Sequence, residues 1–170
     1  MMGSVNDDTL TLLLDVTARL EQCIRDRDCP VIAALDGDRT LTLTDYDYLR
    51  DPATAAAFEQ RAAAHAQRIS VKRWVLAVPQ VWLMTPGAVS ARAVSNHPLR
   101  ESEQEAITWM SFDRDDGVDY GRVPYARRPS GEPVFGEPEM LTANVMPDER
   151  MPGFALLCAI TGDSGEASQQ

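Results

Sequence analysis

Four aspartates surround one glycine in the segment SFDRDDGVDYGR, residues 111–122. Carboxylates at this density could hold a calcium ion, form an acidic catalytic cluster or belong to the turn of a β-hairpin. An EF-hand loop requires glycine at its sixth position and a bidentate glutamate at its twelfth. Counted from Asp113, these positions hold Val118 and Pro124, so the pattern fails. An Asp-Gly step between aromatic-rich segments is typical of a hairpin turn, and we interpret the segment as a hairpin without a metal site.

A pocket between sheet and helices is a second place where chemistry could occur. His97 stands in a predicted loop before Pro98, and loops carry many binding groups. The candidate polar groups of such a pocket are Asn96, His97, Arg100 and Asp113. The chain has two histidines, no cysteine or histidine pair at zinc-ligand spacing, and neither GxGxxG nor Walker A. The sequence therefore indicates no cofactor and assigns no catalytic residue.

Aromatic and cationic side chains gather after the acidic turn. Tyrosine and arginine are among the residue types that dominate binding at protein interfaces. A long proline-rich irregular segment follows them, and we expect recognition through this hairpin together with that segment. We expect the binding residues for a protein partner, or for a second copy of the chain, to be Tyr120, Arg122, Tyr125, Arg127 and Arg128.

Periodicity and turn signals predict the elements that position these residues. Asn6 is a predicted N-cap for a helix that ends before Pro30, and Asp51 with Pro52 begins a second, alanine-rich helix. Asp36-Gly37 predicts a tight hairpin turn. β-branched and aromatic residues predict strands at 31–35, 40–44, 71–78, 81–84, 89–94, 105–112, 120–125 and 154–161.

Two of these assignments have alternatives. Ser102 and Glu105 also match a helical capping box, but the aromatic and β-branched content of 105–112 favours a strand. Pro79 suggests a bulge or a sheet edge between 71–78 and 81–84. The proline- and glycine-rich residues 128–153 predict an irregular loop or arm, with one short strand at 140–145.

These elements predict a single α+β domain over residues 6–161, with flexible termini at 1–5 and 162–170. We expect two helices packed on one face of a mostly antiparallel sheet, in the order α-β-β-α-β-β-β-β-β-β. The long loop 128–153 would precede the last strand.

Composition restricts the class of partner. The 170 residues carry a formal net charge of -10, which disfavours binding to nucleic acid and to anionic membranes. The start of the chain lacks a signal-peptide pattern, and its most apolar segment, 74–84, is too short to span a bilayer. Three cysteines without CxxC spacing suit a reducing compartment. We expect a cytoplasmic protein that binds neither nucleic acid nor membrane.

The sequence favours a non-enzymatic module that binds a protein partner or assembles with itself. One alternative is a small enzyme or ligand-binding domain that uses the pocket residues. A second is an acidic inhibitor that imitates DNA, which requires carboxylates spaced like phosphates on one surface.

Overall fold

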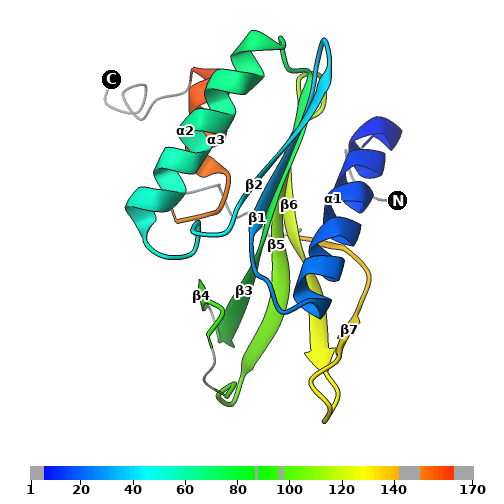
Figure 1. Cartoon of the computed structure of the whole chain (residues 1–170), viewed down its shortest axis with the longest axis vertical. Coiled ribbons are helices and arrows are strands. Elements are labelled where there is room, and N and C mark those ends of the chain that lie inside the picture. Colours follow the sequence, from blue (N-terminus) through cyan, green and yellow to red (C-terminus); the bar gives the residue numbers. More distant parts are fainter. Residues whose placement is uncertain (1–5, 87, 96–97, 142–149, 163–170) are drawn as a thin grey trace.

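A computed structural model describes residues 6–86, 88–95, 98–141 and 150–162 of the chain. The bounds of its helices and strands are α1 Asp7–Arg25, β1 Val31–Asp36, β2 Thr40–Asp45, α2 Pro52–Arg68, β3 Arg73–Thr85, β4 Ala88–Ala93, β5 Glu103–Asp113, β6 Gly117–Arg127, β7 Pro133–Phe135, β8 Glu139–Met140 and α3 Phe154–Thr161. Figure 1 shows a sheet with α1 on one side of it and α2 with α3 on the other. The predicted flexible termini, 1–5 and 162–170, lie outside the described residues except for Gly162, which forms the C-cap of α3.

The sheet is antiparallel and curled, which confirms the predicted mixed α+β class. Its strand order is β2-β1-β3-β5-β6-β7, with β4 beside the second half of β3 and β8 beside β6. The two predicted hairpins are present, since β1 pairs with β2 and β5 pairs with β6. The second hairpin turns at Gly117, whose φ of 85° suits glycine. Residues 105–112 form a strand, as favoured over a helix.

Both predicted helix starts are confirmed by their caps. The Asn6 side chain accepts a hydrogen bond from the Thr9 N–H at 2.8 Å, and Asp51 accepts one from Thr54 at 2.7 Å. Pro52 opens the first turn of α2, where its missing N–H costs nothing.

The predicted strands 71–78 and 81–84 are one continuous strand, β3. On one side β3 pairs with β1 as far as Ala77 and with β4 from Gln80 onward. Pro79 therefore falls between these two neighbours, where a residue without a backbone N–H is tolerated. On its other side β3 pairs with β5 along its length, Pro79 opposite Ile107 included.

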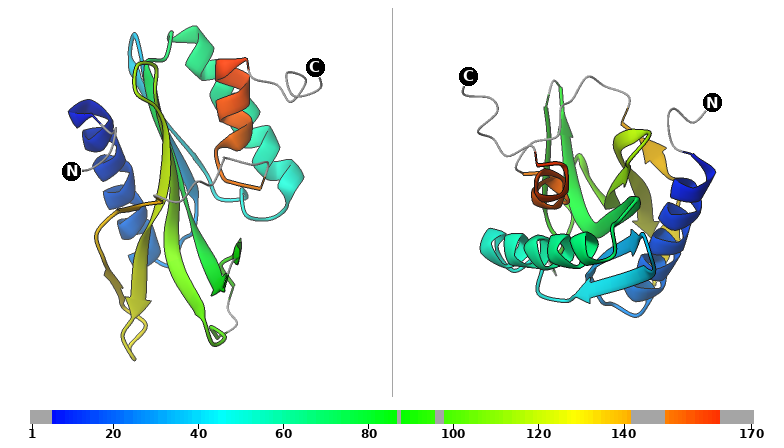
Figure 2. Two further views of the ribbon diagram at one scale, coloured as in Figure 1. Left: turned by 180° about the vertical axis from the view of Figure 1, so that it is seen from behind. Right: turned by 90° about the horizontal axis from the view of Figure 1, so that it is seen from above.

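The prediction that both helices pack on one face of the sheet is wrong. Alternate β1 residues belong to different hydrophobic clusters: Val31 packs in the cluster of Phe58 from α2, and Ile32 in the cluster of Leu20 from α1. Helix α1 therefore covers one face, and α2 with α3 covers the other (Figure 2). The five residues of VIAAL are all buried, which is the pattern of a strand covered on both sides.

The prediction of a final strand at 154–161 is also wrong, because these residues form α3. Gly153 and Gly162 cap this helix at its two ends, with φ of 97° and 71°. Leu156 is fully buried in the cluster of α2. A short apolar run is compatible with a buried strand or a buried helix, and the sequence pattern alone did not separate the two.

The segment 128–153 is less irregular than predicted, because it contains β7 and β8. Met140 belongs to β8, while residues 142–145 of the predicted short strand lie outside the described part. None of the described helices is both long and apolar enough to cross a membrane.

Candidate functional site

The acidic turn is built around one mostly buried carboxylate. The Asp113 side chain is only 6% exposed. Its Oδ2 accepts hydrogen bonds from Asn6 Nδ2 at 3.0 Å and Arg73 Nε at 3.2 Å, and its Oδ1 accepts one from the Asp115 N–H at 2.9 Å. The turn is therefore joined to the start of α1 and to the start of β3.

These contacts determine the charge state of the carboxyl group. Burial alone would raise the pKa of Asp113, but the hydrogen bonds from Asn6, from the turn backbone and from Arg73 together lower it to about 2. Asp113 is thus an ionised structural group that holds three segments together. Within the described ranges, no three His, Cys, Asp or Glu side chains lie together in a way that could hold a metal ion.

Of the proposed pocket residues, the two that the structure describes, Arg100 and Asp113, are not brought together. Asn96 and His97 lie outside the described residues. Arg100 precedes β5 and donates its backbone N–H to Glu103, whereas Asp113 is the last residue of the same strand. An 11-residue strand spans roughly 30 Å, so Arg100 and Asp113 cannot serve one pocket.

The predicted interaction residues are divided between the two faces of the sheet. Successive side chains of a strand point to opposite faces. Tyr120 packs against the cluster of α2, and Arg122 shares its face. Tyr125 belongs to the cluster of α1, and Arg127 is on that same face. The predicted interaction residues on β6 therefore do not share one surface.

Tyr125 is unsuited to contact with a partner, because it is only 2% exposed. Arg127 lies over its ring and forms an ion pair with the buried Glu105 at 2.9 Å. Arg128 is exposed in the turn that leads to β7. On the α1 face, the hairpin thus contributes mainly to the core.

A better candidate lies on the other face, beyond the part that α2 and α3 cover. Here Arg122, 17% exposed, lies over the ring of Trp82, 5.2 Å from its centroid. The Trp82 ring is buried beneath it and is only 5% exposed. Met84 and Val89 pair across β3 and β4 beside it and are 48% and 56% exposed. We call this surface the open α2 face and define it by Trp82, Met84, Val89, Gln104, Arg122 and Pro124.

Polar contacts fix the central arginine and tryptophan of the open α2 face. Arg122 Nε donates to Glu139 Oε2 at 3.1 Å, and Arg122 Nη1 lies 3.4 Å from the Met84 sulfur. The indole N–H of Trp82 donates to Thr108 Oγ1 at 2.7 Å. Both side chains are therefore held in place from more than one direction.

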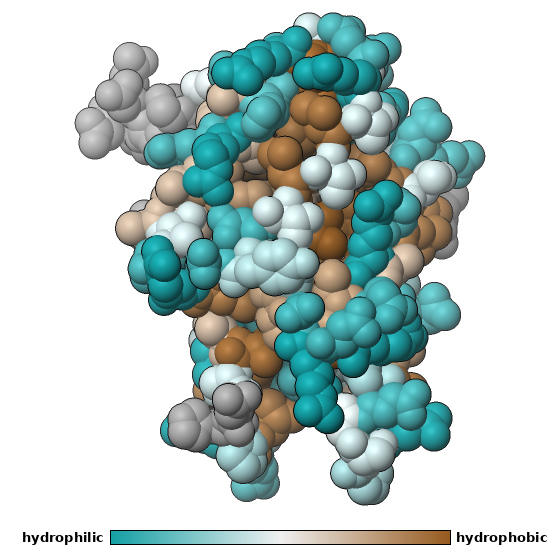
Figure 3. Space-filling view, viewed as in Figure 1, coloured by the Kyte–Doolittle hydropathy of each residue, from teal (hydrophilic) through white to brown (hydrophobic). Residues whose placement is uncertain are grey.

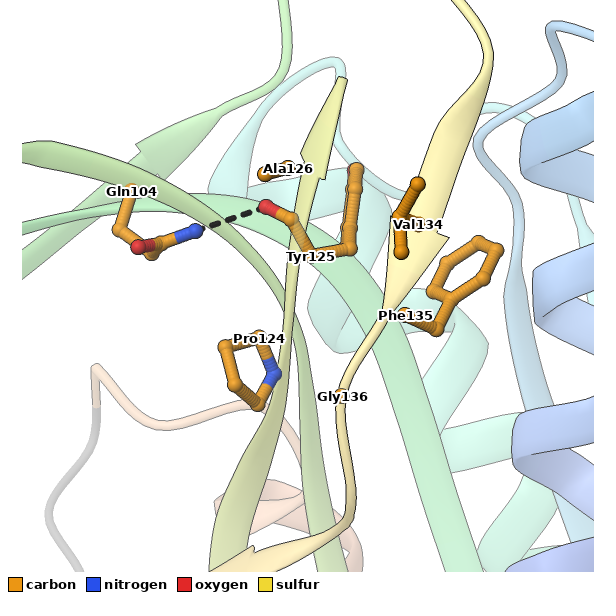
Figure 4. A pocket seen from close by; sticks show the side chains of 7 residues that line it. All are labelled: Gln104, Pro124, Tyr125, Ala126, Val134, Phe135 and Gly136. Atoms are coloured by element: carbon orange, nitrogen blue, oxygen red, sulfur yellow. Dashed lines mark hydrogen bonds between the residues drawn. The ribbon is translucent and has the colours of Figure 1, made fainter. Parts of the chain in front are cut away.

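A shallow hollow of about 260 Å³ adjoins this surface. It forms where main-chain pairing between β5 and β6 stops at Ala106 and Pro124. Beyond that point the Gln104 side chain bridges the strands by donating to the Tyr125 carbonyl at 2.7 Å (Figure 4). The lining is mostly apolar and consists of Gln104, Pro124, Tyr125, Ala126, Val134, Phe135 and Gly136.

The open α2 face was only partly visible in the sequence. Arg122 was predicted as a binding residue, but Trp82, Met84 and Val89 were not. The signal that joins them is strand register, since Trp82 lies opposite Gln104 in β5, and Thr108, on the same face, lies opposite Arg122 in β6. The register of a strand can be assigned only when its partner strands are known, so the sequence alone did not predict that these residues meet.

Compared with protein-family models, with curated proteins and with solved structures, the chain has no match in any of the three.

Proposed function

We propose that this chain is a protein-interaction domain that binds a partner protein through the open α2 face. The observation that carries this proposal is the position of Arg122 over Trp82, beside the exposed Met84. Arginine is enriched among the residues that contribute most to binding energy, and the buried ring of Trp82 supports Arg122 from below. Methionine adapts its shape to a partner at low cost.

The side chains of this surface are held in place before any partner binds, which supports the proposal. Binding loses affinity when long side chains must be immobilised. Arg122 is already held by Glu139, and the Trp82 ring by Thr108, so less conformational entropy is lost when a partner binds. The adjoining hollow, with the exposed Val134 at its edge, offers a place for an apolar side chain of the partner.

The test is partner capture with the full chain from a native lysate. The variants Arg122→Ala and Met84→Glu remove the centre of the open α2 face. We expect each to reduce capture of a specific partner by about tenfold or more, as for hot-spot residues. Arg68→Ala is a matched control, since Arg68 is an exposed arginine at the end of α2.

Thermal unfolding, monitored by circular dichroism, shows whether the variants remain folded. An unchanged set of partners for folded Arg122→Ala and Met84→Glu would exclude the open α2 face as the binding surface. Loss of the same partners in Arg68→Ala would show that the effect is unspecific.

A further inference from the structure

The strand β2 is an edge of the sheet, and its outer side pairs with no strand among the described residues. Its six residues, TLTLTD, pair with β1 one to one without a bulge. The strand contains no proline and no lysine. Natural sheets usually protect their edges with such residues or with bulges, so an edge that lacks them is suited to pairing with another strand.

The two faces of β2 differ in chemistry. Leu41 and Leu43 are half-buried on the α2 side, where they pack against the core cluster. The alternate residues Thr40, Thr42 and Thr44 are exposed on the α1 side. A strand added at this edge must match apolar with apolar and threonine with threonine, because opposite residues of an antiparallel pair share a face.

We propose that β2 pairs antiparallel with β2 of a second copy of this chain, across a two-fold axis through Thr42. In this register Leu41 lies opposite Leu43 of the second copy, and Thr40 lies opposite its Thr44. Each match occurs twice, as an isologous interface requires. The two sheets then join into one continuous sheet.

Charge at the ends of β2 selects this register. It places the exposed Arg39 opposite Asp45 of the second copy, and the symmetry repeats the pair. A shift by two residues in one direction sets Arg39 opposite Leu43, and a shift in the other sets Leu41 opposite Asp45. Both shifts lose the charge pair and bring a charged residue against a leucine, so the register centred on Thr42 is favoured.

Asp45 has the capacity for this additional contact. In the single chain it accepts from Arg61 at 2.9 Å and from the Asp47 N–H at 2.7 Å. A carboxylate offers about four acceptor positions. The two existing contacts therefore leave acceptor positions for the guanidinium of Arg39 from the second copy, which has to approach through the exposed 16% of the Asp45 side chain.

In the view of Figure 1, β2 lies at the front of the sheet. The same view in Figure 3 shows apolar and near-neutral residues over this region, bordered by hydrophilic ones. Strand β2 and strand β6 lie on opposite sides of β1, β3 and β5 in the strand order. Arg122, on β6, therefore lies on the far side of the sheet from β2. The two proposals are tested with different variants and different measurements, so they can fail independently.

The test is sedimentation equilibrium of the purified full chain at about 0.15 M ionic strength, where exposed charges beyond about 8 Å are screened. We expect a dimer for the natural sequence. Arg39→Glu alone sets two carboxylates opposite each other at each end of the paired strands, and Asp45→Lys alone sets two cations there. Each variant should therefore raise the dissociation constant about tenfold. An equimolar mixture of the two variants should dimerise better than either variant alone. In the mixed dimer, one end pair joins the introduced glutamate with the introduced lysine. The other end pair joins the natural Arg39 with the natural Asp45.

Thr42→Lys gives a second measure, since it puts two ammonium groups beside the two-fold axis without disturbing a buried residue. It should convert the dimer to a monomer whose thermal unfolding stays cooperative. A natural chain that sediments as a monomer, a dimer unaffected by Thr42→Lys, or a mixture that dimerises no better than its components would overturn the proposal.

Discussion

Arg73 Nε lies 3.2 Å from Asp113 Oδ2, and Arg73 Nη1 lies 2.7 Å from Asp36 Oδ2. One guanidinium therefore joins the ends of β1 and β5 across the start of β3. Asn6, the N-cap of α1, donates to the same Asp113 oxygen. The side chain of Asp113 thus connects the first helix with the turn of the β5–β6 hairpin, more than a hundred residues later.

Replacing Arg73 with methionine should destabilise the fold by about 1–3 kcal/mol, because it leaves the buried Asp113 carboxylate with fewer partners. The measurement is the free energy of unfolding in urea. Arg19→Met is the control: Arg19 pairs with Asp15 on the exposed side of α1, and such pairs contribute at most about 1 kcal/mol. Equal losses in the two variants would contradict the role given to Arg73.

Acid should unfold the protein partly through Asp113. Its pKa is lowered in the folded state from 3.8 to about 2, so the folded chain binds fewer protons than the unfolded chain between these values. The resulting stability, about 2 kcal/mol, is fully present above about pH 4 and is lost as the pH falls through about 2. Urea unfolding at several pH values from about 2 to about 5 measures it. The free energy of unfolding should depend less on pH in Asp113→Asn than in the natural sequence. An unchanged pH dependence would exclude Asp113 as its source.

Glu59 should have the opposite pH dependence. It is buried under α3, where its carboxylate accepts from the Tyr48 hydroxyl at 2.7 Å and from the Leu156 N–H at 3.0 Å. Burial raises the pKa of Glu59 above 4.5 despite these bonds. The folded chain then binds more protons than the unfolded chain, so stability falls as the pH rises from 4.5 through the folded pKa.

The matched variants for this site are Glu59→Gln and Tyr48→Phe. Glu59→Gln should remove the fall in stability with pH. Tyr48→Phe should cost about 1–3 kcal/mol near neutral pH, since it takes a donor from a buried carboxylate. Unfolding curves at about pH 4.5 and about pH 7.5 compare them, and a Glu59→Gln protein that still loses stability over this range would exclude Glu59 as the cause.

Tyr125→Ala should destabilise the chain by about 3–5 kcal/mol, because the ring is enclosed by the cluster of α1 and contacts Phe135. Tyr125→Phe should change stability by less than about 1 kcal/mol, since the hydroxyl has no hydrogen-bond partner among the described residues. Any loss of partner binding in Tyr125→Ala would therefore follow from unfolding. Thermal unfolding and partner capture on both variants separate these effects. Loss of binding in a stable Tyr125→Phe protein would show that Tyr125 contacts the partner directly.

Local signals predicted most elements of the fold. The caps at Asn6 and Asp51 and the turns at Asp36-Gly37 and Gly117 depend on a few neighbouring residues, and each was confirmed. Local signals did not predict the side of the sheet on which each helix packs, because the apolar stripe of a helix does not specify which face it covers. The buried run 31–35 carried that information, since both of its alternating sets needed cover.

The candidate site was less predictable for a related reason. Tyr125 and Arg122 have residue types common at interfaces, yet strand alternation sends the first into the core and leaves the second at the surface. For 154–161, an apolar octapeptide, only the flanking Gly153 and Gly162 favoured a helix. Whether a strand residue is buried or exposed depends on its position relative to the neighbouring strands. Long-range pairing determines that position, and residue type alone does not reveal it.

The contact between Glu59 and the N-terminus of α3 also orders events during synthesis. Glu59 is made early, whereas Leu156, whose N–H it accepts, is made nearly a hundred residues later. Until then the sheet surface around Met110, which Gly153 contacts closely, lacks its final cover. A growing chain that has not yet reached α3 therefore presents an apolar surface together with a carboxylate that lacks the Leu156 donor. These two groups are covered only once residues 153–161 have been made.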